Sequence, residues 1–184
     1  MDREFYLYFY ALIPPEDIQA DVTKVKLDFK KRFESVHSLK SPPHITLIPP
    51  FRYKLASEGK LIKALDDFAS IEVAFKQKLH DFGFFPPRVI FINVDKSEDL
   101  KRLFHKFKKY MDAKLNISSL TRGGIRFTPH MTVAHRDLTK ENFNKAKPQY
   151  ENKHISFEFE VNEINLLRHD GKRWGIIHSG NFKG

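Results

Sequence analysis

The chain has 184 residues and no cysteine, and its 32 Lys and Arg against 23 Asp and Glu give a formal net charge of +9. This length suits one domain or two tightly packed lobes, and the absence of thiols excludes disulfides and cysteine catalysis. No segment is apolar enough to span a membrane, and the first residues, MDREFYLYFY, lack the order of a signal peptide. We therefore expect a cytoplasmic protein with no membrane partner, and the positive charge favours nucleic acids or nucleotides as partners.

The first half of the chain predicts alternating strands and helices. Aromatic and β-branched residues crowd the segment that ends before Pro14, and two acidic residues follow Pro15, as at a helix start. Further on, apolar residues at helical spacing precede the alternation of Ile71, Val73 and Phe75, which is typical of a half-buried strand. The predicted elements are a strand at 5–13, a helix from 14 to about 33, a helix within 55–70 and a strand at 71–79.

The second half repeats this order and then adds a hairpin. Ser97 and Thr139 each precede acidic and apolar residues as helix N-caps do. The dipeptide at 170–171, Asp-Gly, is a strong hairpin signal between the last two strands. The predicted elements are a strand at 89–94, a helix at 97–114, a helix at 139–147, and strands at 155–161, 163–168 and 174–178.

Each half also contains the same five-residue pattern of Pro, His, apolar, Thr, apolar. It reads PHITL at 43–47 and PHMTV at 129–133, and the two histidines lie 130 − 44 = 86 residues apart, close to half the chain. On an extended backbone His44 and Thr46 point to one face while the apolar residues point to the core, and the prolines restrict the approach to each strand. An internal duplication with a pseudo-two-fold axis would bring both histidines to one cleft.

The chemistry that these residues suit is acid–base catalysis on a phosphodiester. Imidazole has an ordinary pKa of about 6.5, so His44 and His130 can serve as a matched base and acid. The hydroxyls of Thr46 and Thr132 are suitable donors to phosphoryl oxygens that gain charge in the transition state. Neither motif carries the Glu of a zinc-protease helix, and no nucleotide-triphosphate loop is present. We therefore expect no metal and no cofactor.

The two H-x-T-x motifs, HITL at 44–47 and HMTV at 130–133, resemble those of the 2H phosphoesterase superfamily, which includes 2′-5′ RNA ligase-like and cyclic phosphodiesterase proteins. HITLIPPF at 44–51, FFPPRV at 84–89 with the strand after it, and LLRHDGKRWGIIHSG at 166–180 also resemble bacterial members. The resemblance implies one α+β domain over 1–184 with a bilobal, duplicated fold. Two pseudo-symmetric lobes would each contribute one motif, and antiparallel-rich sheets with flanking helices would surround a central cleft.

The resemblance also implies a function. It implies metal-independent opening of 2′,3′-cyclic phosphates, or cleavage or formation of 2′-5′ linkages, on RNA ends or nucleotides. The primary expectation is a phosphodiesterase that acts as a monomer through His44 and His130. Two alternatives stay open, a non-catalytic RNA-binding module and a 2′-5′ RNA ligase activity.

The second motif departs from the family pattern in one respect. Many members carry an Arg five residues after the second motif His, whereas here that position is His135 and the next residue is Arg136. On a continued strand Arg136 would share the face of His130, which favours Arg136 as the phosphate-binding cation. A turn after Ala134 would remove this argument and leave Arg136 facing solvent.

Aromatic residues near the motifs are candidates for stacking on a nucleobase. Trp174 is the strongest candidate and Phe51 is a second, although most of the 18 Phe must belong to the core. The remaining histidines, among them His37 and His169, have no partner motif and are predicted to be surface or structurally satisfied residues.

Overall fold

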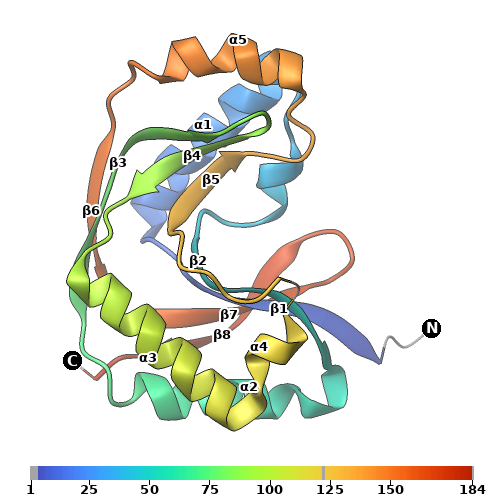
Figure 1. The fold of residues 1–184 in the computed structure, drawn as a ribbon, viewed down its shortest axis with the longest axis vertical. Coiled ribbons are helices and arrows are strands. Elements are labelled where there is room, and N and C mark those ends of the chain that lie inside the picture. The colour runs from blue at the N-terminus through green and yellow to red at the C-terminus, as the bar shows by residue number, and fades with distance from the viewer. Residues whose placement is uncertain (1–3, 122, 184) are drawn as a thin grey trace.

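The computed structural model describes residues 4–121 and 123–183, which form two antiparallel sheets of four strands each (Figure 1). The strands are β1 (Phe5–Leu12), β2 (Ile45–Lys54), β3 (Phe75–Phe85), β4 (Val89–Val94), β5 (His130–Ala134), β6 (Ser156–Val161), β7 (Glu163–His169) and β8 (Trp174–Asn181). The helices are α1 (Glu16–Phe33), α2 (Glu58–Ala69), α3 (Glu98–Leu115), α4 (Ile117–Leu120) and α5 (Lys140–Tyr150), with 3-10 turns at His37–Lys40 and Leu55–Ser57. Among the described residues no helix is both long and apolar enough to cross a membrane.

The two sheets have corresponding strand orders. The first sheet runs β2-β1-β7-β8 and the second runs β5-β4-β3-β6, so each motif strand lies at an edge beside the strand that opens its half of the chain. The two edge strands, β2 and β5, contact each other where the sheets meet. The predicted α+β, bilobal arrangement of two antiparallel sheets with flanking helices is therefore confirmed.

The first long helix of each half packs against the opposite sheet. Helix α1 follows β1 of the first sheet but contacts β5 and α5, whereas α3 follows β4 of the second sheet but contacts α2 and β2. Figure 1 shows the result, with α1 and α5 in the upper lobe and α2, α3 and α4 in the lower one. This exchange means that neither lobe is built from one continuous half of the chain.

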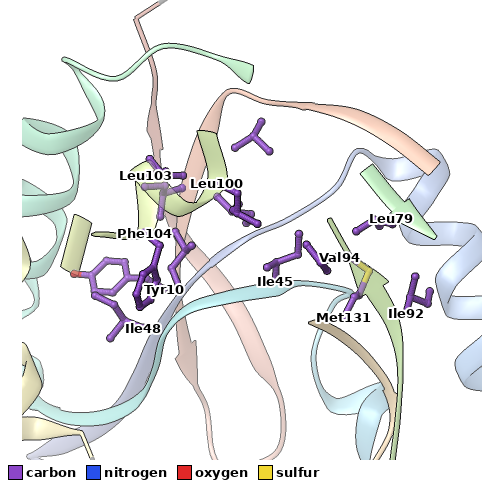
Figure 2. Packing of buried hydrophobic residues seen from close by; sticks show 14 of the residues in the cluster. Tyr10, Ile45, Ile48, Leu79, Ile92, Val94, Leu100, Leu103, Phe104 and Met131 are labelled. Carbon is purple, nitrogen blue, oxygen red and sulfur yellow. The ribbon is translucent and has the colours of Figure 1, made fainter. Parts of the chain in front are cut away.

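The two lobes share one cluster of buried apolar side chains. Tyr10 and Ile45 of the first sheet belong to the same cluster as Val94 and Met131 of the second. Figure 2 shows Ile45, Val94 and Met131 pointing into this common space between the motif strands. Burying each large apolar side chain stabilises the fold by about 1.5–3 kcal/mol. Separating the lobes would expose several of these side chains, so this free energy opposes it.

The predicted helix caps are confirmed. The Ser97 hydroxyl accepts a hydrogen bond from the backbone N–H of Leu100 at 3.2 Å, and the Thr139 hydroxyl accepts one from that of Asn142 at 3.1 Å. These bonds satisfy N–H groups that the first turn of a helix leaves without partners. The starts of α3 and α5 therefore lie where the capping pattern predicts them.

The strand predicted at 71–79 begins later than expected. Ile71 and Val73 are 67% and 58% exposed, and the strand starts at Phe75. The backbone N–H groups of Ile71 and Glu72 bond to the last carbonyls of α2, so the segment is a helix-terminal turn. Its buried residue is Glu72, whose carboxylate pairs with Lys106 of α3 at 2.6 Å. The apolar side chains of Ile71 and Val73 therefore do not form the buried face of a strand.

A glycine substitution tests the packing of β3 on β4 beside the second motif, and a second glycine, at an open position of α2, serves as its control. A Cβ on Gly83 would lie 2.3 Å from the ring of Phe91, so Gly83→Ala should destabilise the protein by about 1–3 kcal/mol through overpacking. Gly59 in α2 has no atom within 4 Å of such a Cβ, so Gly59→Ala should stabilise it by up to about 1 kcal/mol. Urea unfolding measures both, and equal changes for the two variants would contradict the described packing.

Candidate active site

A cavity of about 460 Å³ opens between the two sheets. His44, Thr46 and Trp174 line it from the first sheet and the loop before it, and Thr132 lines it from β5 of the second. Arg136 lines it from the segment just after β5. Residues about 90 positions apart in sequence therefore meet in one cleft.

His44 is held by its own backbone. Its Nδ1 atom lies 2.8 Å from the carbonyl oxygen of Pro42, and the Phe9 ring lies 4.9 Å from the imidazole ring. A carbonyl can only accept a hydrogen bond, so Nδ1 must carry the hydrogen. The neutral ring then keeps its lone pair on Nε2, which is the nitrogen left for a ligand.

His130 has the same arrangement in the second lobe. Its Nδ1 atom lies 2.7 Å from the carbonyl oxygen of Thr128, and the rings of Phe85 and Phe91 each lie 5.3 Å from the imidazole. His130 is not among the described residues that line the 460 Å³ cavity. It lies close enough to His44, however, for its charge to depress the pKa of that residue.

The pKa of His44 is lowered to about 4. Burial is the main cause, the hydrogen bond to Pro42 opposes it, and nearby positive charges, beginning with that of Lys26, lower the pKa further. His44 is therefore neutral at pH 7 in the free protein.

Lys26 of α1 is a buried cation beside the cleft. Its side chain is 2% exposed, and Nζ donates to the carbonyl oxygens of Ser38 and Ser41, both at 3.0 Å. Burial lowers the pKa of Lys26 to about 8. The sequence did contain a signal for this burial, because position 26 falls at helical spacing between Val22 and Phe29, which are both fully buried.

The motif threonines stand between buried neighbours. Ile45, Leu47, Met131 and Val133 are each at most 1% exposed, whereas Thr46 and Thr132 line the cavity. The alternation of each motif thus directs its hydroxyl toward the cleft and its apolar side chains toward the shared core.

The segment after the second motif turns away from strand geometry. Strand β5 ends at Ala134 and Arg136 has a φ of 61°, so the parity argument for Arg136 fails. His135 and Arg136 nevertheless both line the cavity. The His135 ring lies 4.9 Å from that of His37, and burial, together with the charges of His37 and Arg136, lowers the pKa of His135 to about 4.

The two stacking candidates differ in exposure. Phe51 is 1% exposed and packs between Tyr8 and Tyr10, with ring centroids 6.1 and 6.0 Å away, so the expectation that it stacks on a base is wrong. The pairing register places Phe51 opposite Tyr8, on the helix-covered side of the sheet. Trp174 lies at the cavity, where its ring meets that of Phe9 at a steep angle of 76°, with the ring centroids 4.6 Å apart.

The model of the 2′-5′ RNA ligase superfamily matches residues 14–173 of this chain. The chain belongs to this superfamily. The match includes both H-x-T-x motifs, all four strands of the second sheet, and β2 and β7 of the first sheet. It therefore includes residues of both lobes, whereas Phe9 and Trp174 of the cavity lie outside it.

Bacterial relatives match this chain over most of its length. A protein of Geobacillus thermodenitrificans, provisionally named a phosphoesterase, is 29% identical over 165 residues, which cover 87% of this chain and 86% of the relative. A protein of Staphylococcus saprophyticus with the same provisional name is 27% identical over 178 residues, which cover 94% and 96%. The relatives support phosphoesterase chemistry for the family.

Solved structures show the same fold at low identity. A protein of Thermus thermophilus has a TM-score of 0.71 and 20% identity, with 97% of this chain and 98% of that chain covered. The LigT protein of E. coli, complexed with 3′-AMP, has a TM-score of 0.67 and 15% identity, with 98% and 100% covered. At this level of identity the likeness concerns the fold.

The sequence did not predict several of the residues that line the cavity. Lys40, Lys172 and the histidines at 37 and 169 line the same cavity. Asp137 explains part of their convergence, because it accepts hydrogen bonds from the backbone N–H groups of Val36 and His37 at 2.9 and 2.7 Å. Such contacts join loops about 100 residues apart, and no local pattern signals them.

Within residues 4–121 and 123–183, no three side chains of His, Cys, Asp or Glu are grouped so that they could hold a metal ion. The candidate site contains His44, Thr46, Thr132 and Arg136 at the cavity, with His130 near His44. These groups can transfer protons and bind an anion.

The lowered pKa values predict how stability depends on pH. Between about pH 6.5 and 4 the unfolded chain protonates His44 and His135, whereas the folded protein keeps both neutral, so stability should fall as the pH falls through this range. His135→Gln should lose less stability than the wild type between pH 7 and 4.5, and urea unfolding at the two pH values measures this difference. The exposed-residue control His105→Gln should behave as the wild type, and an unchanged slope in His135→Gln would contradict the buried neutral state.

Proposed function

We propose that the protein is a metal-independent phosphodiesterase that opens 2′,3′-cyclic phosphates, or cleaves 2′-5′ linkages, on RNA ends or nucleotides. The observation that carries the proposal is the matched pair of imidazoles, His44 and His130, each with Nδ1 bound to the carbonyl two residues earlier. Solved structures of E. coli LigT with 3′-AMP and with phosphate support a ligand of this class. The net charge of +9 suits a polyanionic substrate.

In the proposed reaction the two histidines exchange protons with water and substrate. One imidazole accepts a proton from water at Nε2 while the water oxygen forms a bond to phosphorus. The bond from phosphorus to the leaving ribose oxygen breaks, and the other imidazole donates a proton to that oxygen. Since His44 is neutral in the free protein, we assign it the role of base and His130 that of acid. An anionic phosphate in the cleft favours protonation of either imidazole and so assists the acid.

The other cleft residues would bind the substrate. The hydroxyls of Thr46 and Thr132 are assigned to the non-bridging phosphate oxygens, where developing charge is greatest. Arg136 is assigned to the same anion, and its guanidinium can present two parallel N–H donors. Trp174, beside Phe9 at the cavity wall, is assigned to stack on the nucleobase. This arrangement leaves both proton-transfer steps to the histidines.

Alanine substitutions test the two-histidine assignment. His44→Ala and His130→Ala should each lower kcat for a 2′,3′-cyclic nucleotide by at least about 100-fold, because each removes a general acid or base. The assay uses protein treated with a chelator, and His105→Ala is the matched control at an exposed histidine. Resolving 2′- from 3′-phosphate products identifies the leaving oxygen.

The alternatives give different results in the same assay. Near-full activity in both single variants would contradict the catalytic assignment. Loss of activity by the chelator alone would contradict the metal-independent mechanism. Tight, salt-sensitive RNA binding without turnover, retained in both variants, would instead indicate a non-catalytic RNA-binding module. Accumulation of new 2′-5′ linkages from RNA ends would indicate a ligase activity.

A further inference from the structure

The face of the first sheet that floors the cleft continues beyond it as an exposed strip. We call Phe5, Leu7, Arg52, Lys54 and His169 the outer strip. The strand pairing places Arg52 opposite Leu7 and Lys54 opposite Phe5, and residues directly opposite one another share a face of the sheet. Along β1 these positions alternate with Tyr8, so they lie on the same face as Phe9 beneath the cavity.

Exposure changes along this face from the cleft outward. Phe9 is 3% exposed, whereas Leu7 and Phe5 are 39% and 37% exposed. Two cations lie over the exposed ring, with the Arg52 guanidinium carbon 5.4 Å and Lys54 Nζ 5.5 Å from the Phe5 ring centre. Lys54 also pairs with Glu4 at 3.0 Å. An accessible ring bordered by cations suits a stacked nucleobase with its phosphate.

The outer strip is continuous with the candidate active site. A shallow hollow of about 500 Å³ is lined by Phe5, Leu7, Arg52 and His169, together with Glu4 and Tyr6. Leu7 and His169 also line the cavity that contains His44. A ligand can therefore extend from the cleft onto the strip without crossing a buried element, and the cations of the strip outnumber the one acidic residue beside it.

We propose that the outer strip binds the nucleotide next to the reacting phosphate, so that the preferred substrate is a single-stranded RNA end rather than a mononucleotide. This inference rests on the proposed phosphodiesterase function and adds a specificity surface to it. The base stacks on Phe5 and Leu7, and Arg52 binds the adjoining phosphate. Neither Phe5 nor Arg52 takes part in the proton transfers.

The test compares two substrates that share one reacting group. These are uridine 2′,3′-cyclic phosphate and a short single-stranded RNA that ends in the same cyclic phosphate. The wild type should turn over the RNA with a kcat/KM about 10-fold higher or more, as stacking of one base allows. Phe5→Ala and Arg52→Ala should each remove most of this advantage and leave the mononucleotide rate unchanged. The exposed-site controls Ile71→Ala and Lys109→Ala should preserve both rates.

Each contrary result has a distinct meaning. Equal wild-type rates for the two substrates, or equal losses on both in the strip variants, would overturn the inference while the phosphodiesterase function stands. If neither substrate reacts, the proposed function fails, and binding of a fluorescent RNA with a 3′-phosphate tests the strip by anisotropy. Phe5→Ala should still weaken that binding about 10-fold, and unchanged binding would overturn the inference. A change of oligomeric state in Phe5→Ala, with RNA turnover intact, would identify a contact between copies instead.

Discussion

Two short hydrogen bonds determine what the cleft can do chemically. The carbonyl oxygens of Pro42 and Thr128 each hold Nδ1 of the histidine two residues later, at 2.8 and 2.7 Å. Because the acceptor is part of the backbone, each ring is fixed in both orientation and tautomer by the segment that leads into its strand. The same local device occurs once in each lobe, and the symmetry of the proposed acid–base pair follows from it.

The shared core holds the two motifs at fixed positions relative to each other. The apolar residues that alternate with the motif side chains, such as Ile45 and Met131, belong to one cluster that spans both sheets (Figure 2). The helix exchange, in which α1 packs on the second sheet and α3 near the first, links the lobes a second time. The cleft therefore lies across a continuous interior, which favours fixed distances between the two histidines that we propose transfer protons to one substrate.

Local patterns predicted much of this structure, and long-range contacts account for part of what they missed. The motif alternation and the caps at Ser97 and Thr139 depend on neighbours within a few residues, so they were predicted correctly. Phe51 was misassigned although the alternation of Ile45 and Leu47, continued to residue 51, places it on their buried face, and the two register shifts between β1 and β2 leave that face unchanged. The convergence of His37 and His135 depends on two segments of one lobe that are about 100 residues apart in sequence, and their spacing gives no sign of it.

The central claim is that both histidines present Nε2, with Nδ1 bound to the backbone, to one phosphate. Two-bond ¹H–¹⁵N NMR correlation of the imidazole rings, at a pH where both are neutral, measures the tautomer of each residue directly, with His44→Gln and His130→Gln to assign the signals. The account predicts the Nδ1–H tautomer for both rings and a shift of both Nε2 signals when 3′-AMP is added. An Nε2–H tautomer in either ring, or a response from only one of them, would contradict it.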